Sequence, residues 1–454
     1  MKLEVLMRKI FIILLTALIL LTSCVSQNTA DTTDGIQTTE QTTATNTADT
    51  CTIPPDDDKP VAPKTNKELY SAFLEAWKNN RISDYYEYAS AELCCLLNKD
   101  AFIGVFNDIT GTFGSISSFT DESQTVNSGY DVFRCKAMLE YANVELTISI
   151  KNLQICGIAH DIRFVKPFDK ELGNGITESY FLLESGEYML NAVYTFCAEN
   201  NSPAVLLVPG SGPSDFNETV GLLTPFKDIA LGLANNGVNS LRFEKRTYRY
   251  PDRFTAKSGI DEEYYEDCKA AVSWLEKQNT SGIYLLGHSL GGQIAAALAE
   301  KVNTKGIILF NSSARHLADI SADQYARLDP SNKTAYEQYA QAAKAATADT
   351  AKGLYYYSLN DYYWASYNEI NVIESLKNAG LPTLIINSSA DNQTFTSDLE
   401  LWEKELSKTE QVTVKVYDDI SHFGYKIDTN DTASLYKPTE FPKELIEEFV
   451  KIIK

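Results

Sequence analysis

The chain has 454 residues, a formal net charge of −21 at pH 7, and 44% hydrophobic against 22% charged residues. This length favours two folded domains, and the composition is that of a globular protein with a buried core. The acidic excess argues against a nucleic-acid-binding protein, which needs clustered Lys and Arg, and it disfavours a strongly anionic substrate.

Residues 1–24 have the pattern of a bacterial lipoprotein signal. Lys2, Arg8 and Lys9 precede an apolar run at 10–21 that is too short to span a bilayer comfortably. The sequence LTSC (21–24) resembles a lipobox, in which the cysteine receives a lipid and becomes the mature N-terminus. The alternative is an ordinary signal peptide with a chance cysteine. We expect export to the outer face of a bacterial membrane, with a lipid anchor at Cys24.

Residues 25–64 are rich in Thr, Asp, Gln and Asn and nearly free of large apolar side chains. A segment of this kind does not bury enough surface to fold. We therefore predict a disordered tether that holds the folded domains away from the membrane.

Residues 65–168 are predicted to form a small α+β domain. The segment NKELYSAFLEAWKNN (66–80) places Leu69, Phe73 and Trp77 at helical spacing, and YANVELTISIKN (141–152) alternates as a strand. A helix followed by antiparallel strands is typical of the α+β class. The domain is similar to the small N-terminal domains, of nuclear-transport-factor or cystatin shape, that precede some secreted bacterial hydrolases. None of its motifs indicates a chemical role.

Residues 175–454 show a different pattern, in which apolar runs alternate with helical segments. This alternation predicts an α/β fold with a mostly parallel sheet covered by helices on both faces. The segment 178–196 predicts an antiparallel hairpin at the sheet edge. A helical, Tyr-rich insertion at about 312–380 falls where a cap over the carboxyl ends of the strands can sit. The apolar runs lie at 204–208, 238–243, 283–287, 306–310, 383–387 and 412–417.

The segment LLGHSLGGQ (285–293) carries the motif G-x-S-x-G, with Ser289 directly after a predicted strand and before a predicted helix. This is the context of a nucleophile elbow. The tight turn needs glycines near the serine, because a Cβ atom there would collide. The turn lifts the hydroxyl above the sheet edge at the positive end of the following helix. Ser289 is therefore the predicted nucleophile.

A serine hydroxyl needs a base to accept its proton. The chain has four histidines, and His422 follows the last predicted strand, where the chain order Ser, Asp or Glu, His expects the base. His160 lies in the small domain, His316 begins the cap, and His288, inside the elbow, is expected to point elsewhere. We predict His422 as the base, against the alternative of a structural imidazole.

Asp391 is the predicted acid that orients the base. It follows the strand at 383–387 and lies between Ser289 and His422 in the chain. The alternative role is that of a solvated turn aspartate. Asp418 and Asp419 are closer to His422 in sequence, but neighbours in sequence seldom have the reach for triad geometry.

Acyl transfer also needs two backbone N–H groups that bind the oxyanion. One is predicted to come from Leu290, which follows the nucleophile, and the other from Ser211 in the loop PGSGPSD (209–215). This loop lacks the Walker lysine and the G-x-G-x-x-G spacing of phosphate-binding loops. No metal or organic cofactor is indicated, and the seven cysteines besides Cys24 (8 − 1) show neither metal-ligand spacing nor a disulfide framework.

Together these motifs resemble the α/β-hydrolase superfamily, in the branch of serine aminopeptidases (S33 type) and prolyl-oligopeptidase-like esterases. In that branch the loop typically reads HGSGPxDRDE and the next strand ends in RYDKRG. The corresponding segments here are PGSGPSDFNET (209–219) and RFEKR (242–246). Pro209 replaces the usual histidine, Phe216 and Asn217 replace the Arg–Asp pair, and Thr247 replaces a glycine. These departures concern substrate preference more than catalysis.

The segment GLYYYSLNDYYWASYNEI (353–370) concentrates aromatic residues in the predicted cap. Such a cluster serves either as a platform for a carbohydrate or aromatic substrate or as packing of the cap against the rim of the sheet. Packing is the favoured interpretation.

The motifs and the resemblance together predict an extracytoplasmic serine hydrolase. The expected activity is that of a carboxylesterase on small acyl esters, through Ser289, His422 and Asp391 and an acyl-enzyme. A serine (amino)peptidase acting on short peptides and a surface binding protein that has lost turnover are the alternatives. The expected partners are the small substrate and the membrane, without nucleic acid. The sequence carries no signal for the oligomeric state or for the natural acyl and alcohol groups.

Overall fold

The computed structural model describes residues 62–199, 201–255, 257–394, 396–406, 408–428 and 439–454. The chain divides into two compact units at Val165 and Lys166. The predicted signal, Cys24 and residues 25–61 of the predicted tether lie outside the described residues. Within the described ranges, no helix has both the length and the apolar character needed to cross a membrane.

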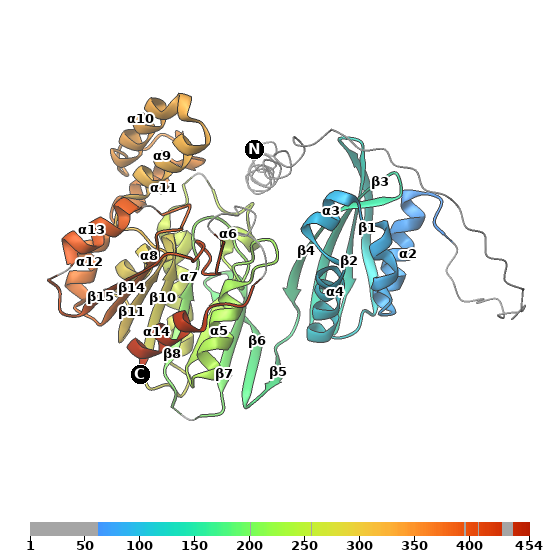
Figure 1. Cartoon of the computed structure of the whole chain (residues 1–454), viewed down its shortest axis with the longest axis horizontal. Coiled ribbons are helices and arrows are strands. Elements are labelled where there is room, and N and C mark those ends of the chain that lie inside the picture. The colour runs from blue at the N-terminus through green and yellow to red at the C-terminus, as the bar shows by residue number, and fades with distance from the viewer. Residues whose placement is uncertain (1–61, 200, 256, 395, 407, 429–438) are drawn as a thin grey trace, which may run out of the picture. The chain divides into compact units, whose positions relative to one another are not determined.

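The N-terminal unit packs its helices against a four-stranded antiparallel sheet (Figure 1). Helix α2 begins after Thr65, whose hydroxyl accepts the Glu68 N–H at 3.1 Å. Its residues Leu69, Phe73 and Trp77 are buried, as are the alternate residues of β3 that face the helices. The elements are α2 (Asn66–Lys78), η1 (Ile82–Tyr88), α3 (Ala91–Leu96), α4 (Lys99–Phe113), β1 (Ser118–Asn127), β2 (Tyr130–Met138), β3 (Ala142–Lys151) and β4 (Gln154–Phe164).

The C-terminal unit is built on a nine-stranded sheet with the order β15-β14-β11-β10-β8-β9-β7-β6-β5. The three strands that come first in the chain, β5, β6 and β7, are antiparallel, and the other six are parallel to one another. This sheet confirms the predicted α/β-hydrolase fold. The strands are β5 (Phe168–Gly173), β6 (Ile176–Ser185), β7 (Tyr188–Cys197), β8 (Ala204–Val208), β9 (Asn239–Phe243), β10 (Ile283–His288), β11 (Gly306–Phe310), β14 (Thr383–Ser388) and β15 (Val412–Tyr417).

Strand β5 lies in a stretch that the predicted boundaries left between the two domains. It pairs with β6 at the edge of the large sheet. Four of its six residues are exposed, so it lacks the continuous apolar run by which the central strands are recognised in the sequence.

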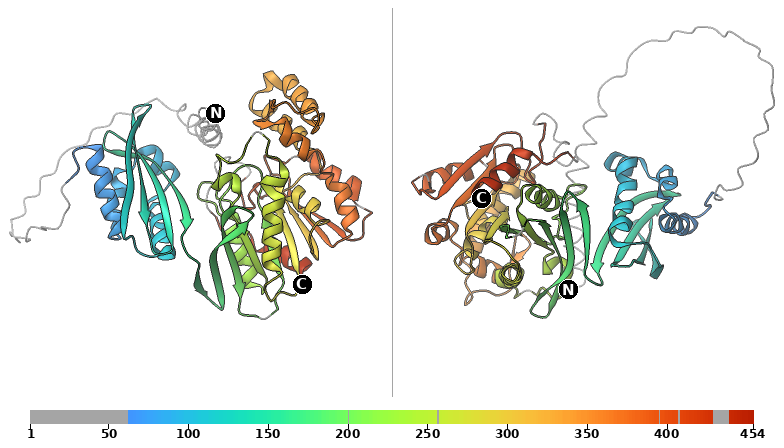
Figure 2. Two further views of the ribbon diagram at one scale, coloured as in Figure 1. Left: turned by 180° about the vertical axis from the view of Figure 1, so that it is seen from behind. Right: turned by 90° about the horizontal axis from the view of Figure 1, so that it is seen from below.

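Helices cover both faces of the large sheet (Figure 1, Figure 2). On one face, Val205 and Leu207 of β8 pack with α5 (Pro225–Asn235) and α14 (Lys443–Ile453). On the other face, Leu206 and Val208 pack with α7 (Glu266–Leu275) and α8 (Leu290–Leu298). These four side chains are each 0% exposed. Burial on both faces explains why the strand is apolar throughout and does not alternate with polar residues.

The insertion between β11 and β14 forms the cap, in which α9 and α10 pack together and stand out from the sheet (Figure 2). Tyr363, Trp364 and Tyr367 are at most 1% exposed, so these aromatic residues pack the cap. Helix α12 packs on α8 and thereby belongs to the helical layer. The insertion contains α9 (Leu317–Leu328), η3 (Pro330–Asn332), α10 (Lys333–Lys344), β12 (Tyr355–Tyr356), β13 (Leu359–Asn360), α11 (Asp361–Tyr367) and α12 (Val372–Ala379).

The described part of this unit also contains α6, η2 and α13. The short α6 (Arg246–Arg249) follows β9, and the π-helical turn η2 (Asp261–Tyr265) leads into α7. Helix α13 (Thr396–Leu406) separates β14 from β15.

Candidate active site

Ser289 occupies a sharp turn between β10 and α8. Its backbone has φ 54° and ψ −123°, a conformation that non-glycine residues adopt only where the surroundings impose it. A Cβ atom on Gly287 would lie 2.1 Å from the Gly291 carbonyl oxygen, and one on Gly291 would lie 2.2 Å from the Val208 carbonyl oxygen. The turn therefore requires both glycines, and Ser289 itself is partly exposed at the end of the sheet.

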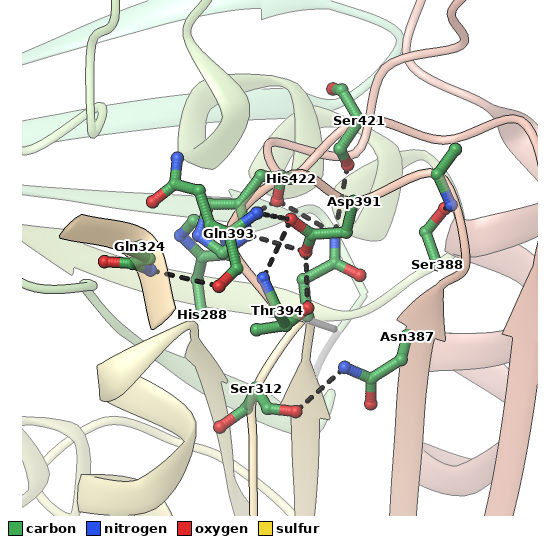
Figure 3. Close-up of polar contacts among 12 residues, drawn as sticks. His288, Ser312, Gln324, Asn387, Ser388, Asp391, Gln393, Thr394, Ser421 and His422 are labelled. Atoms are coloured by element: carbon green, nitrogen blue, oxygen red, sulfur yellow. Dashed lines mark hydrogen bonds and ion pairs between the residues drawn. The ribbon is translucent and has the colours of Figure 1, made fainter. Parts of the chain in front are cut away.

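His422 and Asp391 form a buried pair near this turn. The distance from His422 Nδ1 to Asp391 Oδ2 is 2.7 Å, and both side chains are at most 3% exposed. The Asp391 carboxylate also accepts the Gln393 N–H at 2.7 Å, the Thr394 N–H at 3.2 Å and the Thr394 hydroxyl at 2.7 Å (Figure 3). This arrangement commits Nδ1 of the His422 ring to Asp391, and Nε2 is the ring nitrogen that the carboxylate does not engage.

The surroundings keep Asp391 ionised. Burial by itself would raise the pKa of Asp391, but His422 and the donors from Gln393 and Thr394 outweigh burial and hold that pKa below its ordinary value. Asp418 and Asp419, the alternatives nearer in sequence, are both exposed. Asp419 instead lies 3.5 Å from Lys426 Nζ.

His288, the neighbour of Ser289, joins the turn after β10 to His422. His288 Nε2 lies 2.8 Å from the main-chain oxygen of His422, and the two ring centres are 4.7 Å apart. Within the described residues, the Ser289 hydroxyl makes no hydrogen bond to His422. Such contacts are often long without substrate and tighten when substrate binds.

The glycine-rich loop lies beside the elbow, because a Cβ atom on Gly210 would be 3.2 Å from the Ser289 Cβ. Gly210 donates its own N–H to Glu218 Oε1 at 2.6 Å. In the ranges that the structure covers, the N–H groups of Ser211 and Leu290 have no protein acceptor. Leu290 is the first residue of α8, and the N–H groups of the first helical turn have no acceptor within the helix. Both predicted donors are thus available to an oxyanion.

The structure adds Glu218 and His288 to the candidate site, and the sequence analysis predicted neither contact. The structure places His288 between Glu218 Oε1, at 3.0 Å from Nδ1, and the His422 carbonyl oxygen. Both ring nitrogens therefore face acceptors, which favours the doubly protonated imidazolium. Burial opposes this charge, but the Glu218 carboxylate outweighs it and raises the pKa of His288. The two residues are 70 positions apart, and no local pattern marks their contact.

The remaining histidines lie elsewhere. His316 caps α9 by accepting the Ala318 N–H, and its Nε2 lies 2.8 Å from Asn368 Oδ1. His160 is exposed on β4 of the N-terminal unit. Among the described residues, no three His, Cys, Asp or Glu side chains are grouped so as to hold a metal ion.

Known proteins resemble part of this chain. Residues 262–425 match a family model described as alpha/beta hydrolase fold. Esterase EstD of Thermotoga maritima is 32% identical over 253 residues, which are 55% of this chain and 61% of EstD. A probable 1-acylglycerol-3-phosphate O-acyltransferase of Oryza sativa subsp. japonica is 30% identical over 151 residues, which are 31% of this chain and 34% of that protein. The chain thus spans less than two thirds of either relative.

Two solved structures align with this chain at low identity. Est1E from Butyrivibrio proteoclasticus aligns with a TM-score of 0.42 at 14% identity, over 60% of this chain and 98% of that chain. The Pyrococcus furiosus esterase Pf2001 aligns with a TM-score of 0.40 at 17% identity, over 65% of this chain and 98% of that chain.

Proposed function

We propose that this protein, whose C-terminal unit has the α/β-hydrolase fold, is a serine hydrolase that cleaves small carboxylic esters. The observation that carries the proposal is the 2.7 Å contact between His422 Nδ1 and Asp391 Oδ2, beside a strained serine turn. The 32% identity to EstD, an esterase, supports ester cleavage.

The first half-reaction transfers the acyl group to the enzyme. Ser289 Oγ attacks the ester carbonyl carbon while His422 Nε2 takes the hydroxyl proton, and the carbonyl oxygen becomes an oxyanion held by the N–H groups of Leu290 and Ser211. The bond from the carbonyl carbon to the alcohol oxygen then breaks, and His422 gives the proton to that oxygen. Asp391 holds the ring in place and stabilises its positive charge.

The second half-reaction releases the acid. His422 takes a proton from water, whose oxygen attacks the acyl carbon bound to Ser289. The bond from that carbon to Oγ then breaks, and the proton returns to Ser289. The expected products are one carboxylic acid and one alcohol, with no net change of the protein.

Labelling with a fluorophosphonate probe, together with p-nitrophenyl ester turnover, tests this function. We expect the wild-type protein to label and to hydrolyse short acyl esters, and Ser289→Ala to do neither. Absence of labelling and turnover in a folded wild-type protein would overturn the proposal and favour a binding protein. Release of N-terminal residues from short peptides, with ester turnover negligible, would instead identify a peptidase.

We also propose that the protein acts outside the cytoplasm, anchored by a lipid at Cys24. The support is the LTSC sequence at 21–24, which follows an apolar run. Cells that express the protein are grown with labelled palmitate. Incorporation into wild type and its loss in Cys24→Ala is the expected result, whereas equal labelling of both variants, or of neither, would refute the anchor.

A further inference from the structure

The carbonyl group of Gly210 is held by two buried side chains. Lys245 Nζ donates to this oxygen at 3.1 Å and the Tyr264 hydroxyl donates to it at 2.6 Å. Both side chains belong to the interior, with Lys245 and Tyr264 each 1% exposed. Hydrogen bonds in such surroundings are strong and hold their geometry.

Lys245 is itself fixed by its partners. Its ammonium group lies 2.6 Å from Glu263 Oε1 and 2.7 Å from the Tyr264 hydroxyl oxygen, in addition to the Gly210 oxygen. The three N–H bonds of an ammonium thus have three acceptors. Burial lowers the pKa of Lys245, and the Glu263 carboxylate opposes that effect.

The position of the Gly210 oxygen decides where the next N–H points. In a trans peptide the carbonyl and the following N–H lie on opposite sides of the bond. Because the Gly210 oxygen is turned toward buried Lys245 and Tyr264, the Ser211 N–H is turned away from them. The Gly210 N–H is already bonded to Glu218, whereas the Ser211 N–H, on the far side of the same peptide plane from Lys245 and Tyr264, is available as a donor.

We propose that Lys245 is a positioning residue for the oxyanion hole: it anchors the Gly210 carbonyl and thereby aims the Ser211 N–H at the oxygen of the tetrahedral intermediate. This inference rests on the proposed hydrolase function and deepens it. The Lys245 ammonium group contacts Gly210, Tyr264 and Glu263, and its proposed effect passes through the Gly210–Ser211 peptide plane.

A purely structural ion pair is the competing explanation, and the chain offers a matched control for it. Arg246 is the next residue and pairs with Asp267 at 2.5 Å, with both side chains at most 5% exposed. The side-chain contacts of Arg246 are with Asp267, Glu266, Ser185 and the Tyr188 ring, none of which lies in the loop at 209–215. Loss of this pair removes a buried charge without changing the Gly210 peptide.

The test compares Lys245→Met, Tyr264→Phe and the charge-balanced Lys245→Met/Glu263→Gln with Arg246→Met/Asp267→Asn. Each variant is assayed for kcat and KM on p-nitrophenyl acetate, for inhibition by a trifluoromethyl ketone, which forms a tetrahedral oxyanion on the serine, and for its melting temperature. Loss of an oxyanion donor lowers kcat by about 10²–10³-fold. We expect about 10-fold or more for the Lys245 variants, a smaller loss for Tyr264→Phe, and KM within about 2-fold.

The inhibitor separates positioning from general damage. Affinity for the trifluoromethyl ketone should fall in proportion to kcat in the Lys245 variants, while Arg246→Met/Asp267→Asn should lose thermal stability with kcat nearly unchanged. A folded Lys245 variant with wild-type kcat, or an equal loss of kcat in the control at equal melting temperature, overturns the proposal. If only Tyr264→Phe folds, unchanged kcat and inhibitor affinity in that variant overturn it as well. If the wild-type protein turns over ester and Ser289→Ala does not, the proposed hydrolase function holds whatever the Lys245 variants show.

Discussion

The His288 ring nitrogen Nε2 lies 2.8 Å from the main-chain oxygen of His422, and this contact ties the Ser289 turn to the loop that carries His422. The other nitrogen of the same ring faces Glu218, whose Oε1 also accepts the Gly210 N–H. One buried carboxylate–imidazole pair therefore connects three segments that meet at the active site. Its two side chains are at most 7% exposed.

The pair gives a prediction for stability against pH. The pKa of His288 is raised despite burial, because Glu218 favours the charged ring. The pair therefore contributes fully to the free energy of unfolding at a pH below about 6.5, the pKa of His288 in the unfolded chain. That contribution is lost as the pH rises through the higher pKa of His288 in the folded protein. Glu218→Gln keeps an acceptor for Gly210 but removes the charge. We expect it to lower the free energy of unfolding by about 3–5 kcal/mol at pH 6, and by progressively less toward pH 9, measured by urea denaturation.

Glu178→Gln is the control for this prediction. Glu178 pairs with Arg242 at 2.6 Å in comparable burial, but an arginine does not titrate in this range. Its stability deficit should be flat between pH 6 and 9. A flat deficit for Glu218→Gln would contradict a titrating ion pair at His288.

Asp391→Asn tests Asp391 as the proposed orienting acid against the neighbouring carboxylates. An amide retains a polar contact with His422 but offers no negative charge to the imidazolium, so we expect kcat to fall by roughly 10³–10⁴-fold. Asp419→Asn alters an exposed carboxylate closer to His422 in sequence and should leave kcat within about 2-fold. Steady-state kinetics on one ester decides the matter. Equal effects of the two substitutions would argue against Asp391 as the orienting acid.

The central strands of the sheet could be predicted from sequence because they are buried on both faces. The apolar runs at 204–208 and 306–310 coincide with β8 and β11, and every residue of these two strands is buried. The turn after β10 could also be predicted from the sequence, because it needs glycine at position 287. A Cβ atom there would lie 2.1 Å from the Gly291 carbonyl oxygen. Both signals are local, and they follow from sterics and burial along a few consecutive residues.

The contacts that were not predicted join residues far apart in the chain. Glu218 meets His288 across 70 positions, and Tyr264 meets Gly210 across 54. A glutamate in a polar loop is ordinarily expected to be solvent-exposed. Glu218 is instead buried, with a φ of 53°, and the residues around it in the sequence do not indicate this. Sequence patterns record which face of an element is apolar, but they do not record which distant polar groups complete a buried network.

Gly291→Ala tests the steric requirement of the elbow. The added Cβ would lie 2.2 Å from the Val208 oxygen and 2.5 Å from the Pro209 oxygen, both of them backbone atoms. We expect insoluble protein or a loss of more than about 4 kcal/mol in the free energy of unfolding. Gly104→Ala in α4, where nothing lies within 4 Å, should instead stabilise its helix by about 0.5–1 kcal/mol. A well-folded, active Gly291→Ala enzyme would show that the turn is wider than the structure has it.

The aromatic residues of the cap either pack it or form a platform for the substrate, and substitutions of a buried and an exposed tyrosine distinguish the two roles. Tyr367 donates to Gln293 Oε1 at 2.8 Å and accepts the Leu317 N–H at 3.0 Å, so it anchors the cap to α8. Tyr367→Phe should cost about 1–3 kcal/mol of stability, since it leaves the buried Gln293 oxygen without that donor. Tyr355 is 46% exposed, and Tyr355→Ala should change stability by less than about 0.5 kcal/mol.

If the aromatic residues serve as packing, Tyr355→Ala keeps KM unchanged for both phenyl and alkyl esters. A KM that rises for phenyl esters alone, with alkyl esters unaffected, would mean that the exposed ring binds the substrate and that packing describes only its buried neighbours Tyr363, Trp364 and Tyr367. The comparison of two ester classes in one variant is needed because a general weakening of the cap would raise KM for both.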